Sequence, residues 1–129
     1  MPQTWFDLAK DARKAANQLV SNHYRSCVAR AYYAAYSKVT HALAGAPGVN
    51  FPARREGPHH PGEAGTGGIR RLIETSMPDM DRPRRLKLSE LVGRLYSLRI
   101  FADYHPSVEV EDRDAREAIA IMNTVFESF

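Results

Sequence analysis

An arginine and a histidine close a long stretch of apolar periodicity, at Arg99 and His105. A guanidinium can hold a phosphate, and an imidazole can transfer a proton near neutral pH. Together the two groups could cleave RNA without a metal ion, with Arg99 stabilising the charge of the transition state and His105 moving the proton. The plainer interpretation is an exposed ion pair between Arg99 and Asp103, followed by a solvated histidine.

The predicted reaction is attack by an RNA 2′-hydroxyl on the adjacent phosphorus, a reaction that DNA cannot undergo. Asp103 could orient Arg99, or it could simply form an ion pair with Arg99 or Arg30. Tyr104 could stack on a base. On an unbroken helix Arg99 and His105 would lie about 120° apart. The helix must therefore loosen before Pro106, and a two-fold axis at this helix end could bring the groups of two subunits together.

Formal charge is distributed unevenly along the chain. Residues 1–50 hold 6 Lys and Arg against 2 Asp and Glu, residues 51–100 hold 10 against 6, and residues 101–129 hold 2 against 7. A basic excess of this kind is typical of surfaces that attract polyanions. The basic residues that we expect to follow an RNA backbone are Arg30, Arg82, Arg84, Arg85 and Arg94.

A second chemical cluster lies in a region rich in glycine and proline, where His59 and His60 precede Glu63. Histidines beside a carboxylate could bind a transition metal, but adjacent histidines flanked by proline are poorly preorganised. The single cysteine, Cys27, supplies neither a disulfide nor a cysteine-ligated zinc site. We therefore predict no metal and no cofactor.

The elements that must position these residues are helices. Apolar residues recur with a period of 3.6, and no strict alternation persists long enough to predict a strand. Thr4 with Asp7 indicates a helix start, Gly45 ends the second helix, and Pro83 suits the first turn of the fourth. The first predicted helix begins near Thr4 and ends before Ser21. The other predicted helices cover residues 22–44, residues 68–76, residues 83 to just before Pro106, and residues 112–126.

These segments predict an all-α fold, an up-and-down antiparallel bundle of four long helices and one short helix. The chain, residues 1–129, is the length of one domain. Residues 46–67 are expected to form a flexible loop rich in glycine and proline. Because no stretch offers about 18 uncharged apolar residues, we expect a soluble cytoplasmic protein with no membrane partner.

The second predicted helix alternates small alanines with large tyrosines, from Ala29 to Tyr36. Alanines allow helices to approach closely. Tyr32, Tyr33 and Tyr36 point in different directions, so at least one of them must meet a partner or solvent, with its hydroxyl seeking a hydrogen bond. We predict that these three tyrosines form a dimer interface.

Two of these segments resemble signatures of the HEPN superfamily. Its members often carry serine- or alanine-arginine-x-tyrosine-tyrosine-alanine on the second helix, which Ala29–Tyr36 matches, and arginine-x-x-alanine-aspartate-tyrosine on the fourth, which Arg99–Tyr104 matches. The resemblance spans roughly residues 5 to 127. It implies a small up-and-down helical bundle that forms a homodimer through its second and fourth helices.

The resemblance also implies a choice of functions. Many HEPN domains are metal-independent endoribonucleases with an arginine, four to six residues and a histidine, and the spacing of Arg99 and His105 fits. Bacterial members often act as toxins paired with a nucleotidyltransferase antitoxin, or in antiphage defence. Other members are noncatalytic modules that bind RNA, a nucleotide or a partner nucleotidyltransferase. Ile100 stands where nucleases usually have a polar residue, which keeps this alternative open.

Overall fold

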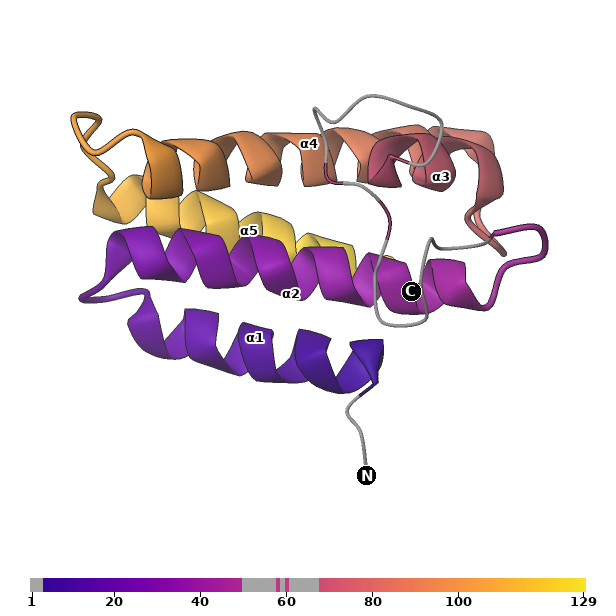
Figure 1. Ribbon diagram of the computed structural model, residues 1–129, viewed down its shortest axis with the longest axis horizontal. Helices are drawn as coiled ribbons and strands as arrows, with labels where there is room; N and C mark the ends of the chain where they lie inside the picture. The colour runs from indigo at the N-terminus through magenta and orange to yellow at the C-terminus, as the bar shows by residue number, and fades with distance from the viewer. Residues whose placement is uncertain (1–3, 50–57, 59, 61–67) are drawn as a thin grey trace.

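The structure, a computed structural model, describes residues 4–49, 58, 60 and 68–129. This part of the chain is all-α, as predicted, and its helices succeed one another as an up-and-down bundle (Figure 1). The helices are α1 (Trp5–Leu19), α2 (Tyr24–Ala44), α3 (Ile69–Ser76), α4 (Arg82–Tyr104) and α5 (Asp112–Glu127). Each helix lies within a few residues of its predicted range.

Helix α2 is the centre of the bundle. It packs against α1, α4 and α5, while the short α3 lies on α4. Figure 1 shows that α2 and α5 run in one direction and that α1 and α4 run in the other. This arrangement brings the first half of α2 beside the second half of α4, so the two motif segments of the sequence become neighbours.

Local signals in the sequence explain where helices begin. The Thr4 hydroxyl accepts a hydrogen bond from the Asp7 amide at 3.1 Å, and the Asp7 carboxylate accepts one from the Thr4 amide at 3.1 Å. The predicted capping box is therefore confirmed. At the start of α4, Asp81 accepts from the Arg84 amide at 3.0 Å, and Pro83 occupies the first turn.

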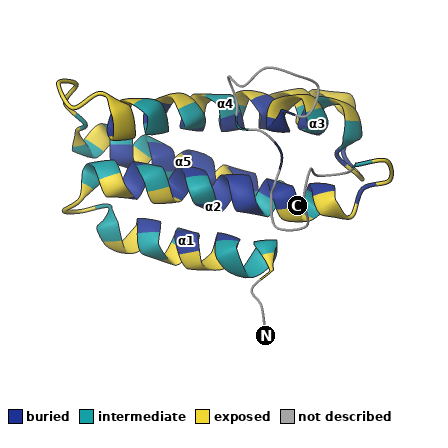
Figure 2. Ribbon diagram, viewed as in Figure 1, coloured by how far each residue is buried: buried dark blue, intermediate teal, exposed yellow. Residues whose placement is uncertain are grey.

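The core explains the alanine-rich composition of α2. Ala31, Ala34 and Ala35 are fully buried, and Figure 2 shows burial along most of the length of this helix. Small side chains let α1 approach α2 closely, since the buried residues of α1 are all alanines. On the other side, large residues of α4 and α5 such as Leu95 and Met122 complete the core.

The predicted flexible loop, residues 46–67, lies largely outside the described residues, which include only 46–49, 58 and 60 of it. Pro58 is buried, and its carbonyl accepts a hydrogen bond from the Tyr36 hydroxyl at 2.6 Å. The described helices include none long and apolar enough to cross a membrane.

Candidate anion-binding pocket

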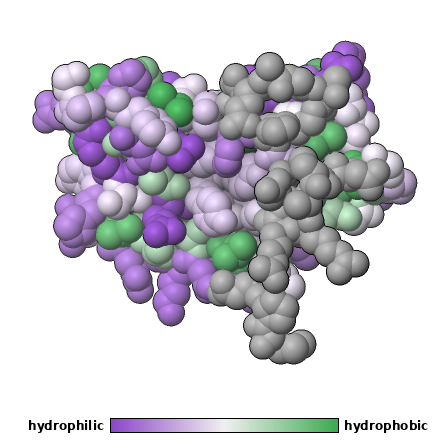
Figure 3. Space-filling view, in the orientation of Figure 1, coloured by the Kyte–Doolittle hydropathy of each residue, from purple (hydrophilic) through white to green (hydrophobic). Residues whose placement is uncertain are grey.

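A pocket of about 400 Å³ opens between the first half of α2 and the second half of α4. Figure 3 shows hydrophilic side chains gathered over these halves of the two helices. The polar and charged groups that line the pocket include Arg25, Arg30, Tyr32, His60, Arg99 and Asp103. Three guanidinium groups against one carboxylate give the pocket a positive charge, which favours an anionic ligand.

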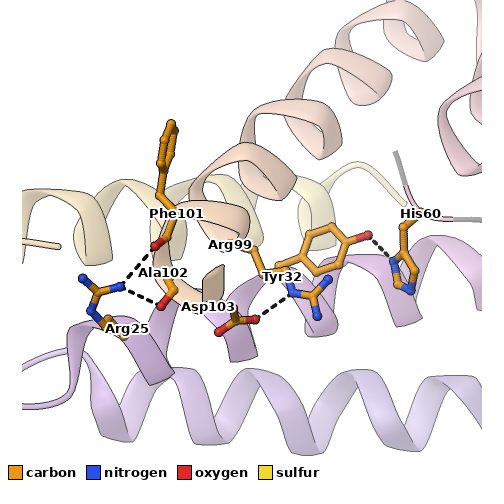
Figure 4. A network of polar contacts seen from close by, with 7 residues as sticks. All are labelled: Arg25, Tyr32, His60, Arg99, Phe101, Ala102 and Asp103. Atoms are coloured by element: carbon orange, nitrogen blue, oxygen red, sulfur yellow. Dashed lines mark hydrogen bonds and ion pairs between the residues drawn. The ribbon is translucent and has the colours of Figure 1, made fainter. Parts of the chain in front are cut away.

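Arg99 is held in place by contacts on several sides (Figure 4). Its Nε donates to Asp103 Oδ2 at 2.9 Å, so the expected ion pair four residues along α4 is confirmed. Its guanidinium carbon lies 5.6 Å from the ring centroids of both Tyr32 and Tyr104, within the range of a cation–π contact. The side chain remains 25% exposed, so a ligand can still reach it.

Arg25 was missed by the sequence analysis. Helix α4 has no basic residue in its last turn, so its terminal carbonyls need donors from elsewhere. The Arg25 guanidinium on α2 supplies them (Figure 4). It donates to the carbonyls of Phe101 at 3.1 Å, Ala102 at 2.8 Å, His105 at 3.3 Å, Pro106 at 3.4 Å and Val108. The lack of a basic residue in the last turn of α4 was the sequence signal that could have pointed to Arg25.

His105 does not lie beside Arg99 in a common site, as the sequence analysis expected. As predicted, α4 ends at Tyr104, and His105 leaves the helical conformation with φ −123° and ψ 78°. Its ring, however, lies 5.4 Å from that of Phe101, and His105 is not among the residues that line the pocket. Within one chain, the structure therefore does not bring Arg99 and His105 into a common pocket, because the loosened backbone leaves the imidazole on the Phe101 side of α4.

The histidine that lines the pocket is His60 instead of His105. Its Nδ1 lies 2.6 Å from the Tyr32 hydroxyl (Figure 4), and its ring stacks on Tyr36 with centroids 4.5 Å apart. The sequence analysis considered His60 only as a metal ligand with His59 and Glu63, which both lie outside the described residues. The tyrosine hydroxyls of α2, which needed partners, were the available signal.

The tyrosines predicted to form a dimer interface are partly enclosed by the chain itself. Tyr32 and Tyr36 are only 2% and 4% exposed, and their hydroxyls meet His60 and the Pro58 carbonyl. These two side chains therefore offer almost no surface to a second subunit. Tyr33 is half-buried and lines the pocket. The dimer itself stays a prediction.

Of the arginines expected to follow an RNA backbone, Arg30 lines the pocket. Arg84 donates to the Ser128 carbonyl at 3.1 Å, and Arg85 donates to the carbonyls of Glu74 and Met80 at 3.0 and 2.8 Å. Arg82 is exposed at the start of α4. The sequence cluster is therefore spread over a different end of the bundle from the pocket.

Arg94 faces the acidic last helix. It forms two hydrogen bonds with Glu117 on α5, at 2.8 and 2.9 Å. This pairing raises the pKa of Arg94 and lowers the pKa of Glu117. A guanidinium engaged in this way is less available to a phosphate.

Two other chemical groups considered from the sequence are the Cys27 thiol and a possible metal site. Cys27 is buried, and desolvation raises the pKa of its thiol to about 11, so it is a poor nucleophile. Among the residues that the structure describes, no group of three or more histidine, cysteine or acidic side chains could hold a metal ion.

Comparison of the chain with family models, with characterised proteins and with solved structures gives no match. The resemblance to the HEPN superfamily therefore rests on the two sequence segments alone. The fold adds one fact about them. Residues of both segments, among them Arg30 and Tyr32 from the first and Arg99 and Asp103 from the second, line the same pocket.

Proposed function

We propose that the protein is a metal-independent endoribonuclease whose phosphate site is the pocket between α2 and α4. The observation that carries this proposal is the gathering of Arg30 and Arg99 around one pocket that also holds an imidazole, while Arg25 adds positive charge from its position against the end of α4. A phosphodiester supplies the negative charge that these groups lack. Since exposed residues such as Arg30 and Asp103 line the pocket, it reaches the surface of the bundle, where a polymer can bind.

Arg99 is the residue that we assign to the reacting phosphate. Asp103 holds its Nε, which leaves the terminal nitrogens of the planar guanidinium to point at phosphate oxygens. The 2′-oxygen attacks phosphorus, the bond from phosphorus to the 5′-oxygen breaks, and the products are a 2′,3′-cyclic phosphate and a 5′-hydroxyl. Arg99 stabilises the charge that grows on the non-bridging oxygens.

Tyr104 extends the site along the strand. The residue is 62% exposed, and its ring lies beside the Arg99 guanidinium. An exposed aromatic ring next to a phosphate site can stack on the neighbouring base without strong sequence preference. Arg30, exposed on α2, would contact a further phosphate.

The wider role follows from the resemblance. We propose a cytoplasmic toxin or antiphage-defence component that acts as a homodimer, with a nucleotidyltransferase as the possible antitoxin. Exposed apolar side chains at the end of α4 support a subunit contact there, since Phe101 is 45% and Val108 is 39% exposed.

A noncatalytic module that only holds RNA is the second candidate. The position of His105 outside the pocket favours it, as does Ile100, which follows the phosphate-binding arginine with an apolar side chain. Both candidates use the same pocket, so cleavage separates them.

The test is incubation of end-labelled RNA with purified protein in chelator. Arg99→Ala should lower the cleavage rate by at least about 100-fold. Arg116→Ala is the matched control, because Arg116 also donates through Nε to an aspartate four residues away, Asp112 at 2.7 Å, but lies on α5. RNA binding that weakens with salt and yields no fragments would support the noncatalytic module instead. Cleavage that survives Arg99→Ala would remove the site assignment.

A further inference from the structure

We propose that a cluster of basic and aromatic side chains away from the pocket is a second RNA-binding site, which holds a more distant part of the strand. The cluster joins three cations to three phenylalanine rings from the surface of α1, α2 and the end of α5. We call it the Lys38 cluster, and its members are Phe6, Lys10, Arg13, Lys38, Phe126 and Phe129. The choice of RNA as its ligand rests on the proposed function.

Lys38 is the centre of the cluster. Its Nζ lies 4.9 Å from the ring centroid of Phe6 on α1. The same atom lies 5.9 and 5.3 Å from the ring centroids of Phe126 in α5 and Phe129 just after it. These distances lie in the range of cation–π contacts. Three rings from both sides of α2 therefore surround one half-buried ammonium group.

Two further cations share these rings. Lys10 Nζ lies 4.6 Å from the Phe6 centroid, and the Arg13 guanidinium carbon lies 4.5 Å from the Phe126 centroid. Because each of them shares a ring with Lys38, the three cations are gathered on one part of the surface. Like charges gathered in this way repel one another, and an anion bound between them relieves the repulsion.

The protein itself compensates little of this charge. Lys10 forms an ion pair with Asp7 at 3.6 Å. Arg13 donates instead to a neutral group, the Asn123 side-chain oxygen, at 2.9 Å. No carboxylate of the residues that the structure describes lies within ion-pair distance of Lys38. The cluster therefore keeps a positive charge, as a site for a phosphate backbone requires.

The aromatic rings favour a single-stranded nucleic acid over other anions. Phe129 is 47% exposed, so a base can reach its ring beside the basic groups. Basic groups that follow the backbone, together with aromatic rings on which bases stack, are the usual means of binding single strands. The exposed residues of α1 are all polar or charged, so this face offers few apolar side chains to a membrane.

The Lys38 cluster and the pocket lie on different sides of α2. Figure 1 shows α1 and α4 on opposite sides of this helix, and the cluster uses α1 whereas the pocket uses α4. Along α2, Lys38 lies about 12 Å beyond Arg30, at a rise of about 1.5 Å per residue. A dinucleotide in the pocket is too short to reach the cluster, whereas a long strand can contact both. The length of the RNA therefore separates the two sites.

The experiment compares a labelled single strand of about 20 nucleotides, longer than one binding site, with a dinucleotide. Lys38→Met removes the charge but keeps an unbranched side chain among the rings. It should weaken binding of the long RNA by about fivefold and lower the slope of log affinity against log salt by about one. Cleavage of the dinucleotide should keep the wild-type kcat/KM, since the pocket is unchanged.

Control variants separate charge from packing. Lys38→Arg keeps the charge and should bind the long RNA as the wild type does, whereas a loss equal to that of Lys38→Met would overturn the role of charge. Lys87→Met removes an exposed lysine of α4 outside both sites and should change nothing. Phe129→Leu should weaken binding by about fivefold even at high salt, because stacking is not screened. Thermal unfolding identifies any variant that fails to fold.

The outcomes separate this inference from the proposed ribonuclease. Binding of the long RNA that is weakened by Arg99→Ala but unchanged in Lys38→Met would overturn the second site and leave the pocket in place. Binding that depends on Lys38, without any cleavage by the wild-type protein, would support the second site and overturn the endoribonuclease. Anionic phospholipid vesicles or polyglutamate that bind through Lys38 more tightly than the long RNA would overturn RNA as the ligand of the cluster.

Discussion

Both ends of α4 carry arginines, but their guanidinium groups meet different partners. At the first end, Arg84 donates to the Ser128 carbonyl, and Arg85 donates to carbonyls in α3 and just after it. At the second end, Arg99 binds a carboxylate on its own helix and lines a pocket. The first set is consumed by the fold, whereas the second remains available to an anion.

The difference teaches that charge density along a sequence does not locate an anion site. The cluster from Arg82 to Lys87 is the densest basic segment of the chain, yet two of its guanidinium groups donate to backbone carbonyls. The pocket instead collects arginines from two helices, and although Arg25 donates to backbone carbonyls there, Arg99 keeps part of its side chain exposed. A hollow that several guanidinium groups share is the better indicator of phosphate binding.

The largest expected effect is on RNA cleavage, and it comes from substitutions that keep the positive charge at either end of α4 but change the shape of the side chain. Arg99→Lys keeps the positive charge but loses the planar fork that Asp103 orients, so cleavage should fall by about 100-fold. Arg84→Lys at the other end should leave cleavage within about twofold, because Arg84 lies outside the pocket. Initial rates on labelled RNA measure both, and equal losses would erase the distinction between the two ends.

A stability measurement tests whether the arginines at the start of α4 serve the fold. Arg85→Ala removes both donors to the carbonyls of Glu74 and Met80, so it should lower the free energy of unfolding by about 1–3 kcal/mol. RNA affinity should not change. Arg82→Ala, at an exposed position of the same turn, should cost less than about 0.5 kcal/mol. Urea denaturation provides the values, and weakened RNA binding by folded Arg85→Ala would contradict the division of roles.

The salt dependence of RNA binding gives a smaller effect. If Arg30 contacts a phosphate, Arg30→Ala should lower the slope of log affinity against log salt by about one. Arg84→Ala should keep the wild-type slope. Titrations at several salt concentrations decide this, and an unchanged slope for Arg30→Ala would exclude Arg30 from the RNA path.

The smallest effect concerns the middle of α4, where Arg94 pairs with Glu117. Glu117→Gln should cost less than about 1 kcal/mol of stability, because both side chains are partly exposed. The pair lowers the pKa of Glu117 below its unfolded value, so it stabilises the protein above the unfolded pKa, and this stabilisation disappears as the pH falls through the folded pKa. The difference in free energy of unfolding between wild type and Glu117→Gln at neutral pH should therefore disappear at acidic pH. Denaturation curves at the two pH values measure it, and a difference that persists at acidic pH would contradict this account.

Much of the fold could be predicted from particular residues. The capping pair of Thr4 and Asp7, the early Pro83 and the stop before Pro106 act through contacts between close neighbours, so the helix ends were found within a few residues. The pairing of Arg99 with Asp103 was predicted for the same reason, since residues four apart share one face of a helix.

The candidate site was only partly predictable. Arg30, Arg99 and Asp103 were selected by their motifs and do line the pocket. Arg25 was missed because its acceptors are carbonyls from a distant part of the chain, which no local pattern reveals. The partners of Tyr32 and Tyr36 were missed because His60 and Pro58 come from a segment without helical periodicity.

The sequence by itself determined which segments are helical and, within a few residues, where they begin and end. These properties depend on periodicity and on contacts across a few residues. Only the tertiary structure decided which histidine shares the pocket with Arg99. That choice depends on the contacts of His60 with Tyr32 and Tyr36, and on the turn that leaves His105 beside Phe101.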